Sequence, residues 1–342
     1  MPRLGRTDLD VFPLCLGGNV FGWTASEQES FAILDAYAAA GGNFIDTADS
    51  YSAWVPSHVG GESETIIGRW MAARGCRNRM IIATKVGRAP GRLGLGRKNI
   101  RAGAEASLKR LGVDCIDLYY AHADDLNTPI DETLREFDAL VREGKVGYIA
   151  ASNFTAARLS AALATSAREG LARYVALQPH YNLMVRNEYE GDLSDVCARE
   201  GVACVPYFAL AMGFLTGKYR PGITVDSARA EGAQKYLDAR GTRVLAALDD
   251  IAAAQHTTVA AVALAWLLAQ PTIAAPIASA RTVAQLADLL PLATTTLTPE
   301  ESTRLADSSR EDPRGSDRSD HRARRDSASR RAVARSRRRR AG

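Results

Sequence analysis

The sequence predicts an α/β protein in which eight parallel strands, each followed by a helix, close into a barrel. Short apolar runs bounded by Gly, Asn or Asp alternate with longer amphipathic stretches, a pattern typical of repeated strand–helix units. Eight such units occupy about 290 residues, which is the size of one barrel domain. A doubly wound open sheet is the second alternative for the same alternation.

The elements are expected at regular intervals along the chain. Strands are expected near residues 12–16, 43–46, 80–84, 116–120, 146–151, 174–178, 202–206 and 273–277. Helices are expected near 26–40, 63–74, 98–110, 131–142, 155–168, 189–200, 242–255, 258–269 and 282–290. Ser26 with Glu29, and Thr155 before an Ala-rich run, are typical helix starts.

Three connecting segments stand out. The opening segment RLGRTDLDVFPLCLGG has turn residues between short alternating runs, so it is expected to form a β-hairpin that closes the bottom of the barrel. Residues 52–62 and 208–241 are long connections that follow predicted strands. Long loops at the carboxyl ends of barrel strands commonly serve binding, so both are candidate parts of a site.

The charge is concentrated at the C-terminus. Residues 310–342 hold thirteen Arg and five acidic residues, a net +8, against +4 for the whole chain, so residues 1–309 carry −4. This tail has almost no apolar residues and is expected to be a disordered basic extension of a barrel domain over residues 1–309. It has no aromatic residue for base stacking, which favours a disordered extension over a nucleic-acid-binding segment.

Composition narrows the class of protein further. No apolar run reaches the length of a membrane span, and the N-terminus has no signal-peptide core, so we expect a cytoplasmic protein without membrane contact. The five Cys residues include no CxxC motif and are expected to be reduced thiols. No histidines accompany the close acidic pair Asp46 and Asp49 at ligand spacing, so no metal site is predicted.

Four polar residues fall where predicted strands end. Asp46 closes GGNFID, Tyr51 follows in TADSY, Lys85 closes MIIATK and His122 closes CIDLYYAH. The carboxyl ends of successive parallel strands lie together, so these groups are expected to meet. An ammonium beside a phenol lowers the pKa of that phenol, and a carboxylate keeps the ammonium charged. Such a site can protonate a carbonyl while a hydride arrives, which predicts an oxidoreductase. By spacing alone, a structural role for these residues remains an equal alternative.

A resemblance to a known family covers roughly residues 1–307. The segments GGNFIDTADSY, IIATKVG, SLKRLGVDCIDLYYAH, REGKVGYIAASNF, PYFALAMGFLTGKY and VALAWLLAQPTIAAPIASARTVAQL occur in order and resemble the aldo-keto reductases. That resemblance implies a TIM-type barrel, a nicotinamide cofactor and a small-molecule aldehyde or ketone as substrate. By position it implies that Tyr51 is the general acid, that Lys85 and Asp46 tune it, and that His122 orients the carbonyl.

The resemblance also implies a cofactor site for NADPH, with NADH as the second possibility. Ser152, Asn153 and Gln178 match the family's carboxamide-binding set, and Tyr207 matches the ring that stacks on the nicotinamide. The phosphate-binding loop and the adenosine end match at these positions: Leu210, Gly213, Leu215, Gly217, Lys218, Ser279, Arg281, Gln285 and Asp288. Two departures occur, since Leu289 replaces the usual Asn and Phe208 replaces a serine.

The substrate pocket is the least determined part. Trp23, Trp54 and His122 are expected to contact the substrate, although either Trp could simply cover the site. A second function remains open, because one branch of the family consists of NADPH-binding subunits of ion channels. The chain could therefore be a redox-sensing regulatory subunit with little turnover. A homo-oligomer is also left open.

Overall fold

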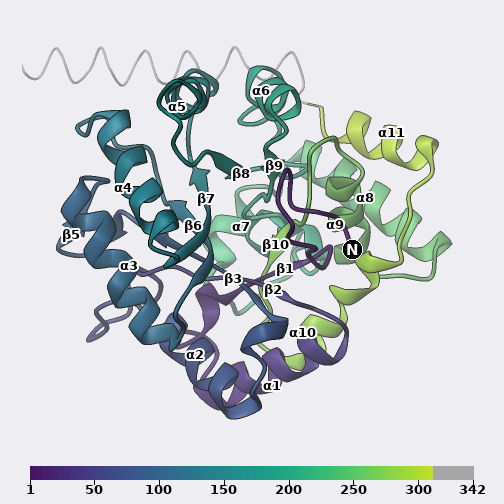
Figure 1. The fold of residues 1–342 in the computed structure, drawn as a ribbon. Helices are drawn as coiled ribbons and strands as arrows, with labels where there is room; N and C mark the ends of the chain where they lie inside the picture. The colour runs from purple at the N-terminus through teal and green to yellow at the C-terminus, as the bar shows by residue number, and fades with distance from the viewer. Residues whose placement is uncertain (311–342) are drawn as a thin grey trace, which may run out of the picture.

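The computed structural model describes residues 1–310. Residues 311–342 lie outside this part, so the prediction of a disordered basic tail over 310–342 falls almost entirely outside the described residues. Within residues 1–310, strands gather in the middle and helices surround them (Figure 1).

The central sheet has eight strands in the order β10-β1-β2-β3-β6-β7-β8-β9, and all neighbouring pairs are parallel. The strands are β1 (Cys15–Gly17), β2 (Phe44–Asp46), β3 (Ile81–Val86), β6 (Ile116–Ala121), β7 (Val146–Ser152), β8 (Tyr174–Gln178), β9 (Ala203–Cys204) and β10 (Ile277–Ala278). A parallel bridge between Cys204 and Ile273 joins β9 to the segment before β10, and the Ile277 amide donates to the Pro206 carbonyl. These contacts close the sheet into a barrel and exclude the open doubly wound sheet.

The helices follow the strands as predicted. They are α1 (Glu27–Ala39), α2 (Glu62–Arg74), α3 (Arg97–Leu111), α4 (Ile130–Arg142), α5 (Ala156–Glu169), α6 (Asp192–Glu200), α8 (Ala239–Ala254), α9 (Val259–Leu268) and α10 (Val283–Ala287). The predicted helix starts are confirmed, because Ser26 and Glu29 form a capping box and the Thr155 hydroxyl accepts a hydrogen bond from the Arg158 amide.

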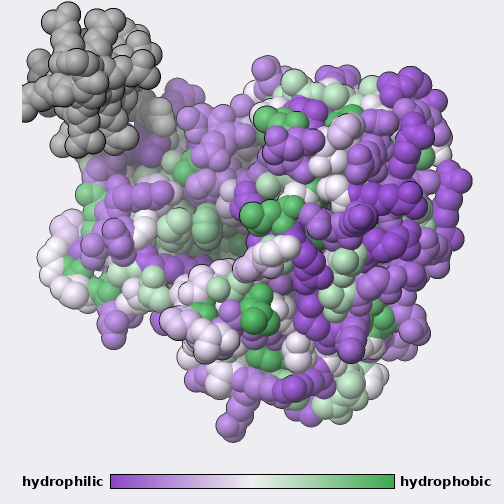
Figure 2. Space-filling view, turned by 90° about the vertical axis from the view of Figure 1, so that its left-hand side faces the viewer, coloured by the Kyte–Doolittle hydropathy of each residue, from purple (hydrophilic) through white to green (hydrophobic). Residues whose placement is uncertain are grey.

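Two apolar clusters form the core. Side chains alternate across each strand, so one set points into the barrel and the other toward the helices. In β6, Leu118 and Tyr120 belong to the smaller, inner cluster, whereas Tyr119 and Ala121 belong to the larger cluster that the helices cover. On the outer face in Figure 2, hydrophilic side chains are interspersed with small hydrophobic patches.

Some elements differ from the expectation. Leu4 and Val11 pack into the inner cluster, but residues 3 and 10 form just one isolated antiparallel bridge, so a hairpin of strands at the N-terminus is not confirmed. The sequence pattern missed a short antiparallel hairpin of β4 (Arg88–Ala89) and β5 (Arg92–Leu93), which follows β3 directly. It also missed two helices, α7 (Ala230–Gln234) and α11 (Pro299–Ser308).

Within residues 1–310, no single helix is long and apolar enough to cross a membrane. Helices α8 and α9 reach the required length and apolarity only as a pair, with a bend of 99° between them. The same part of the chain contains no group of three or more His, Cys, Asp or Glu side chains arranged to hold a metal ion.

Candidate active site

A cavity of about 760 Å³ opens at the carboxyl ends of the barrel strands. Asp46, His122, Ser152 and Gln178 line it from the ends of β2, β6, β7 and β8, and Ser279 lines it just after β10. This is the face where the loops of a parallel barrel converge. The volume is in the range of pockets that bind cofactors and small molecules.

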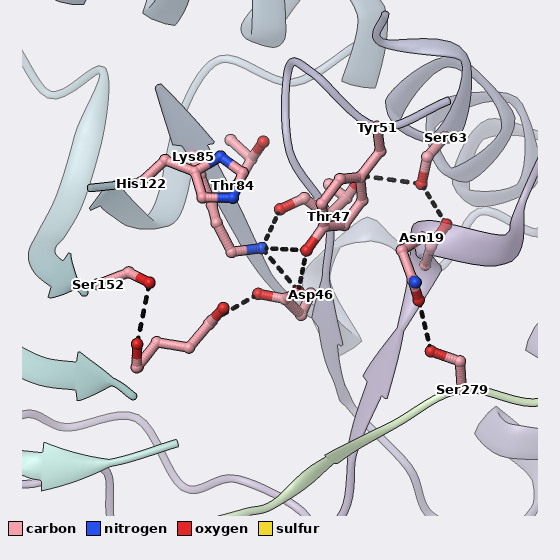
Figure 3. A network of polar contacts seen from close by, with 12 residues as sticks. Asn19, Asp46, Thr47, Tyr51, Ser63, Thr84, Lys85, His122, Ser152 and Ser279 are labelled. Carbon is pink, nitrogen blue, oxygen red and sulfur yellow. Dashed lines mark hydrogen bonds and ion pairs between the residues drawn. The ribbon is translucent and has the colours of Figure 1, made fainter. Parts of the chain in front are cut away.

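The predicted catalytic residues meet at one side of this cavity. The Lys85 ammonium lies 2.7 Å from Asp46 Oδ2, 2.7 Å from the Thr47 carbonyl and 2.8 Å from Tyr51 Oη. Figure 3 shows this nitrogen at the centre of the three contacts. The Tyr51 hydroxyl also lies 3.1 Å from Asp46 Oδ2. The ring centroids of Tyr51 and His122 are 6.1 Å apart, so the imidazole lies next to the phenol.

Local backbone pairing holds Tyr51 in place. After β2 ends at Asp46, the chain keeps pairing with β3, because the Thr47 amide donates to Ala83 and the Asp49 amide donates to Lys85. The Tyr51 carbonyl then accepts a hydrogen bond from the Gly61 amide at the end of the long loop. The four residues between Asp46 and Tyr51 therefore turn the phenol back over the strand ends.

Burial decides the protonation states at this site. Burial raises the pKa of Tyr51 well above its usual value, and the Asp46 carboxylate adds to the rise. This rise is opposite to the direction predicted from the sequence, because the Lys85 ammonium, the one group in that prediction, has less effect than burial. Burial lowers the pKa of Lys85, and Asp46 opposes this by stabilising the ammonium. Burial also lowers the pKa of His122 well below its usual value, with smaller contributions from Lys85 and Arg88. At neutral pH the tyrosine is therefore protonated and the imidazole neutral.

Hydrogen bonds connect Ser152 and Gln178, at the ends of β7 and β8, to Asp46. The Gln178 side-chain amide donates to Asp46 Oδ1 at 2.9 Å, and the Ser152 hydroxyl donates to the Gln178 carbonyl at 2.9 Å. Asn153 adopts the left-handed conformation with φ of 58°, and its side-chain oxygen accepts a hydrogen bond from Tyr207. The Tyr207 ring stacks on His180 at 5.3 Å. The predicted carboxamide-binding set is thus one network connected to the predicted acid.

An aromatic wall covers the Tyr51 side of the cavity. Trp23 and Trp54 pack edge to face with centroids 5.4 Å apart, and Trp54 also packs against Tyr51 at 6.1 Å. Trp54 is half exposed, whereas Trp23 lies deeper and carries the Arg229 guanidinium 5.8 Å above its ring. Both predicted substrate residues therefore border the space next to the phenol.

The far end of the cavity carries the predicted phosphate and adenosine residues. Leu210, Gly213, Lys218, Ser279, Arg281, Gln285 and Asp288 all line it, whereas Leu215 and Gly217 do not. Phe208, Ala211 and Met212 have left-handed backbone conformations, which marks the loop after β9 as strained. Ser279 donates to Asn19 at 2.6 Å, and Gln285 accepts a hydrogen bond from the Arg281 amide at 2.9 Å.

The sequence profile of the Aldo/keto reductase family matches residues 13–310, which is most of the chain. The chain belongs to this family. Its membership supports an NAD(P)H-dependent oxidoreductase that acts on small carbonyl compounds.

Curated relatives agree with this aldo/keto reductase assignment. Protein tas of Escherichia coli (strain K12) is 35% identical over 318 residues, covering 83% of this chain and 90% of the relative. The uncharacterized oxidoreductase YrpG of Bacillus subtilis (strain 168) is 36% identical over 296 residues, covering 84% and 89%. A probable voltage-gated potassium channel subunit beta of Oryza sativa subsp. japonica is 33% identical over 315 residues, covering 87% and 93%.

Several residues that line the cavity of this aldo/keto reductase are not predicted from the sequence, among them the polar residues Asn19, Arg88 and Arg229. Arg88 lies in the unpredicted hairpin, and Arg229 lies in the long connection over 208–241, which was expected to border the site but without a named residue. A single arginine in a polar loop is usually a solvated charge, so the pattern held no signal for either.

Proposed function

We propose that this chain is an NADPH-dependent reductase that converts the carbonyl of an aldehyde or ketone to an alcohol, with Tyr51 as the proton donor. The observation that carries the proposal is the 2.8 Å contact between Tyr51 Oη and the buried ammonium of Lys85, at a cavity wall shared with His122. A protonated phenol beside a fixed cation is suited to release its proton as negative charge develops on a carbonyl oxygen.

Each residue has a separate role in the proposed reaction. Tyr51 donates its hydroxyl proton to the carbonyl oxygen, and Lys85 stabilises the phenolate that remains. Asp46 keeps Lys85 charged in a position where its side chain is fully buried. The neutral His122 orients the carbonyl oxygen by a hydrogen bond. The two Trp residues exclude water and pack against the rest of the substrate.

The cavity fits a phosphorylated nicotinamide cofactor. A reduced nicotinamide, when bound, would supply the hydride. Gln178 and Asn153 offer the donor and acceptor groups that a carboxamide needs, and Tyr207 offers a ring face. Burial lowers the pKa of Lys218 and of Arg229, and the nearby Arg281 lowers both further, so the three cations lie close together. Three neighbouring cations suit a pyrophosphate together with an adenosine phosphate, which favours NADPH over NADH.

The second candidate is a regulatory subunit that binds NADPH tightly with little turnover. The similarity to a probable potassium channel subunit beta favours it. The position of Tyr51, Lys85, Asp46 and His122 around one cavity favours the enzyme, because a subunit that only senses the cofactor does not need a complete proton donor.

The decisive experiment measures NADPH consumption by the purified protein across a panel of aromatic and aliphatic aldehydes and ketones, with NADPH affinity measured in parallel by fluorescence. The reductase proposal expects multiple turnovers on at least one carbonyl class. Tight stoichiometric binding with no turnover on the whole panel would favour the regulatory subunit instead.

A further inference from the structure

Four cationic side chains line the cavity, against two carboxylates. The cations are Arg88, Lys218, Arg229 and Arg281, and the carboxylates are Asp46 and Asp288. Asp46 is already engaged by Lys85. Within residues 1–310, none of the four cations forms a salt bridge. A cavity with this excess of unpaired positive charge is suited to anionic ligands.

The four cations fall into two groups. Burial, Arg281 and Arg229 lower the pKa of Lys218, and burial and Arg281 lower that of Arg229, so these three cations lie near one another. Lys218 and Arg281 line the end that the proposed cofactor phosphates would occupy, and Arg229 lies between that end and the Trp23 ring, 5.8 Å from its centroid. Arg88 belongs to a different neighbourhood, because its charge acts on His122 and on Tyr207. These two rings flank the place where the proposed chemistry occurs. Once the cofactor phosphates are assigned to the first group, Arg88 is left without an anionic partner.

The antiparallel hairpin of β4 and β5 holds the Arg88 backbone next to the end of β3. Gly87, with φ of 107°, lies between the last residue of β3 and Arg88, and Arg88 pairs with Leu93. The Gly94 amide donates to the Gly87 carbonyl at 3.0 Å. The Leu95 amide donates to the Asp125 carboxylate at 2.8 Å, which ties the hairpin to the loop after β6. Arg88 therefore lines the cavity from a hairpin that begins directly after β3.

The other acidic groups on this side do not neutralise Arg88. Asp125 is engaged by the Leu95 amide and the Thr128 hydroxyl, and Asp124 forms a bidentate pair with Arg158. Glu188 lies 3.4 Å from His180, behind the Tyr207 ring. None of these carboxylates pairs with Arg88, which is exposed and lines the cavity.

We propose that Arg88 binds a carboxylate on the carbonyl substrate, so that the protein reduces carboxylate-bearing aldehydes or ketones in preference to neutral ones. A guanidinium matches the two oxygens of a carboxylate by paired hydrogen bonds. One cation matches the single charge of a carboxylate better than the nearly doubled charge of a phosphate ester. The aromatic wall of Trp23 and Trp54 suits an aromatic spacer between the carbonyl and the carboxylate. This inference rests on the proposed reductase function.

The test compares matched substrates in wild type and in Arg88→Gln. The probes are para-carboxybenzaldehyde, its methyl ester, and para-formylphenyl phosphate. We expect wild type to prefer the acid over the ester, mainly through KM. In Arg88→Gln the ratio of kcat/KM for acid to ester should fall about 10–100-fold, because one charge-assisted contact is lost. Arg88→Lys should recover part of the ratio.

Arg92→Gln is the matched control, because it removes a cation from the other strand of the same hairpin without altering the cavity lining. Its acid-to-ester ratio should equal that of wild type. Equal loss of the ratio in both variants, or no acid preference in wild type, would overturn the proposal. A stronger preference for the phosphate probe than for the carboxylate would overturn the choice of carboxylate.

A binding readout separates this inference from the reductase proposal. Para-methylbenzoate cannot be reduced at its carboxylate under these conditions, and its binding can be followed by quenching of the cavity Trp fluorescence in the presence of NADPH. Weaker binding in Arg88→Gln than in Arg92→Gln supports the carboxylate site even if no carbonyl is turned over. Equal binding in the two variants contradicts it even if the protein proves to be a reductase.

Discussion

Lys85 is the residue on which the charge balance of the site depends. Its side chain is fully buried, and its ammonium contacts Asp46, Thr47 and Tyr51 at once. Replacing it by Met leaves the Asp46 carboxylate buried beside a hydroxyl without its cation. We expect Lys85→Met to lower the free energy of unfolding by about 3–5 kcal/mol, measured by urea denaturation.

The double variant Asp46→Asn with Lys85→Met is the control for this prediction. It removes both charges together, so it should recover a large part of the lost stability while remaining inactive. If the double variant is as unstable as Lys85→Met alone, packing of the Lys85 stem rather than the unpaired charge determines the loss.

Asp49 is a second buried acid, and the proposed chemistry does not use it. It is 1% exposed, and neither carboxylate oxygen has a hydrogen-bond partner among residues 1–310. Burial, and then the nearby Glu64, raise the pKa of Asp49 from 3.8 to about 7. The folded protein therefore holds a proton on Asp49 that the unfolded chain releases at lower pH.

This shift predicts a stability change with pH. Between about pH 4 and pH 7 the folded state binds more protons than the unfolded state, so the contribution of Asp49 to stability falls as the pH rises, and it stays low above pH 7. Asp49→Asn should remove this dependence. Its free energy of unfolding should therefore rise relative to that of wild type by on the order of 3 kcal/mol from pH 5 to pH 8. Denaturation at several pH values measures it. Asp114→Asn, at an exposed position, should keep the pH dependence of wild type, and a pH dependence in Asp49→Asn equal to that in Asp114→Asn would contradict the assignment.

At the scale of elements, helices α2 and α3 meet at Gly68. A Cβ atom at this position would lie 2.5 Å from the Arg110 carbonyl oxygen and 2.6 Å from that of Leu111, both of them backbone atoms. Gly to Ala normally stabilises a helix interior by about 1 kcal/mol. At Gly68 the same substitution should instead destabilise the protein, because the added Cβ would force α3 away from α2.

We expect Gly68→Ala to lower the free energy of unfolding by about 1–3 kcal/mol, since it overpacks a helix contact. Thermal and urea unfolding measure this change. Ala73→Gly is the control on the exposed side of the same helix, where only helix propensity changes, at a cost of about 1 kcal/mol. Stabilisation by Gly68→Ala would show that the two helices do not approach as closely as described.

The sequence predicts the regular elements well because they carry strong local patterns. All eight barrel strands and nine helices follow from apolar runs, caps and glycine stops. The hairpin of β4 and β5 has only two residues in each strand, and α7 has five, so neither presents a full period of apolar residues. The N-terminal segment has the turn residues of a hairpin, yet Leu4 and Val11 pack into the barrel and only one bridge forms. Tertiary packing overrides local pattern there.

At the scale of the whole molecule, a mildly acidic body encloses a cationic cavity. Residues 1–309 carry −4, while four unpaired cations line the cavity. This arrangement favours a strongly anionic ligand inside, as expected for NADPH. At a concentration one hundred times its Kd, a ligand stabilises the folded state by about 2.7 kcal/mol. The unfolding temperature should therefore rise more with NADPH than with NADH at equal concentration.

Arg281→Ala should reduce the difference between the rises in unfolding temperature with NADPH and with NADH, because this variant lacks the proposed partner of the adenosine phosphate. Differential scanning fluorimetry with both cofactors measures it, and Arg243→Ala, outside the cavity lining, is the control. Unchanged discrimination in Arg281→Ala would assign the phosphate to Lys218 or Arg229 instead.

The site could be predicted in part for a physical reason. Asp46, Lys85 and His122 stand at strand ends, where topology alone brings residues together, and Tyr51 follows within one turn of the loop. Arg88 and Arg229 stand in irregular segments whose path depends on tertiary contacts, such as the tie between Leu95 and Asp125. The direction of the pKa shift of Tyr51 could not be predicted either, because it depends on the burial of the phenol, which the sequence does not report.

The central claim is that Tyr51 donates the proton in a carbonyl reduction. The most direct measurement is kcat/KM for NADPH-dependent reduction of a reactive aromatic aldehyde by Tyr51→Phe, with NADPH affinity measured on the same protein. We predict a fall of about 10²–10⁴-fold in kcat/KM, the usual contribution of a general acid, with NADPH affinity close to that of wild type. Turnover by Tyr51→Phe at the wild-type rate would contradict the account.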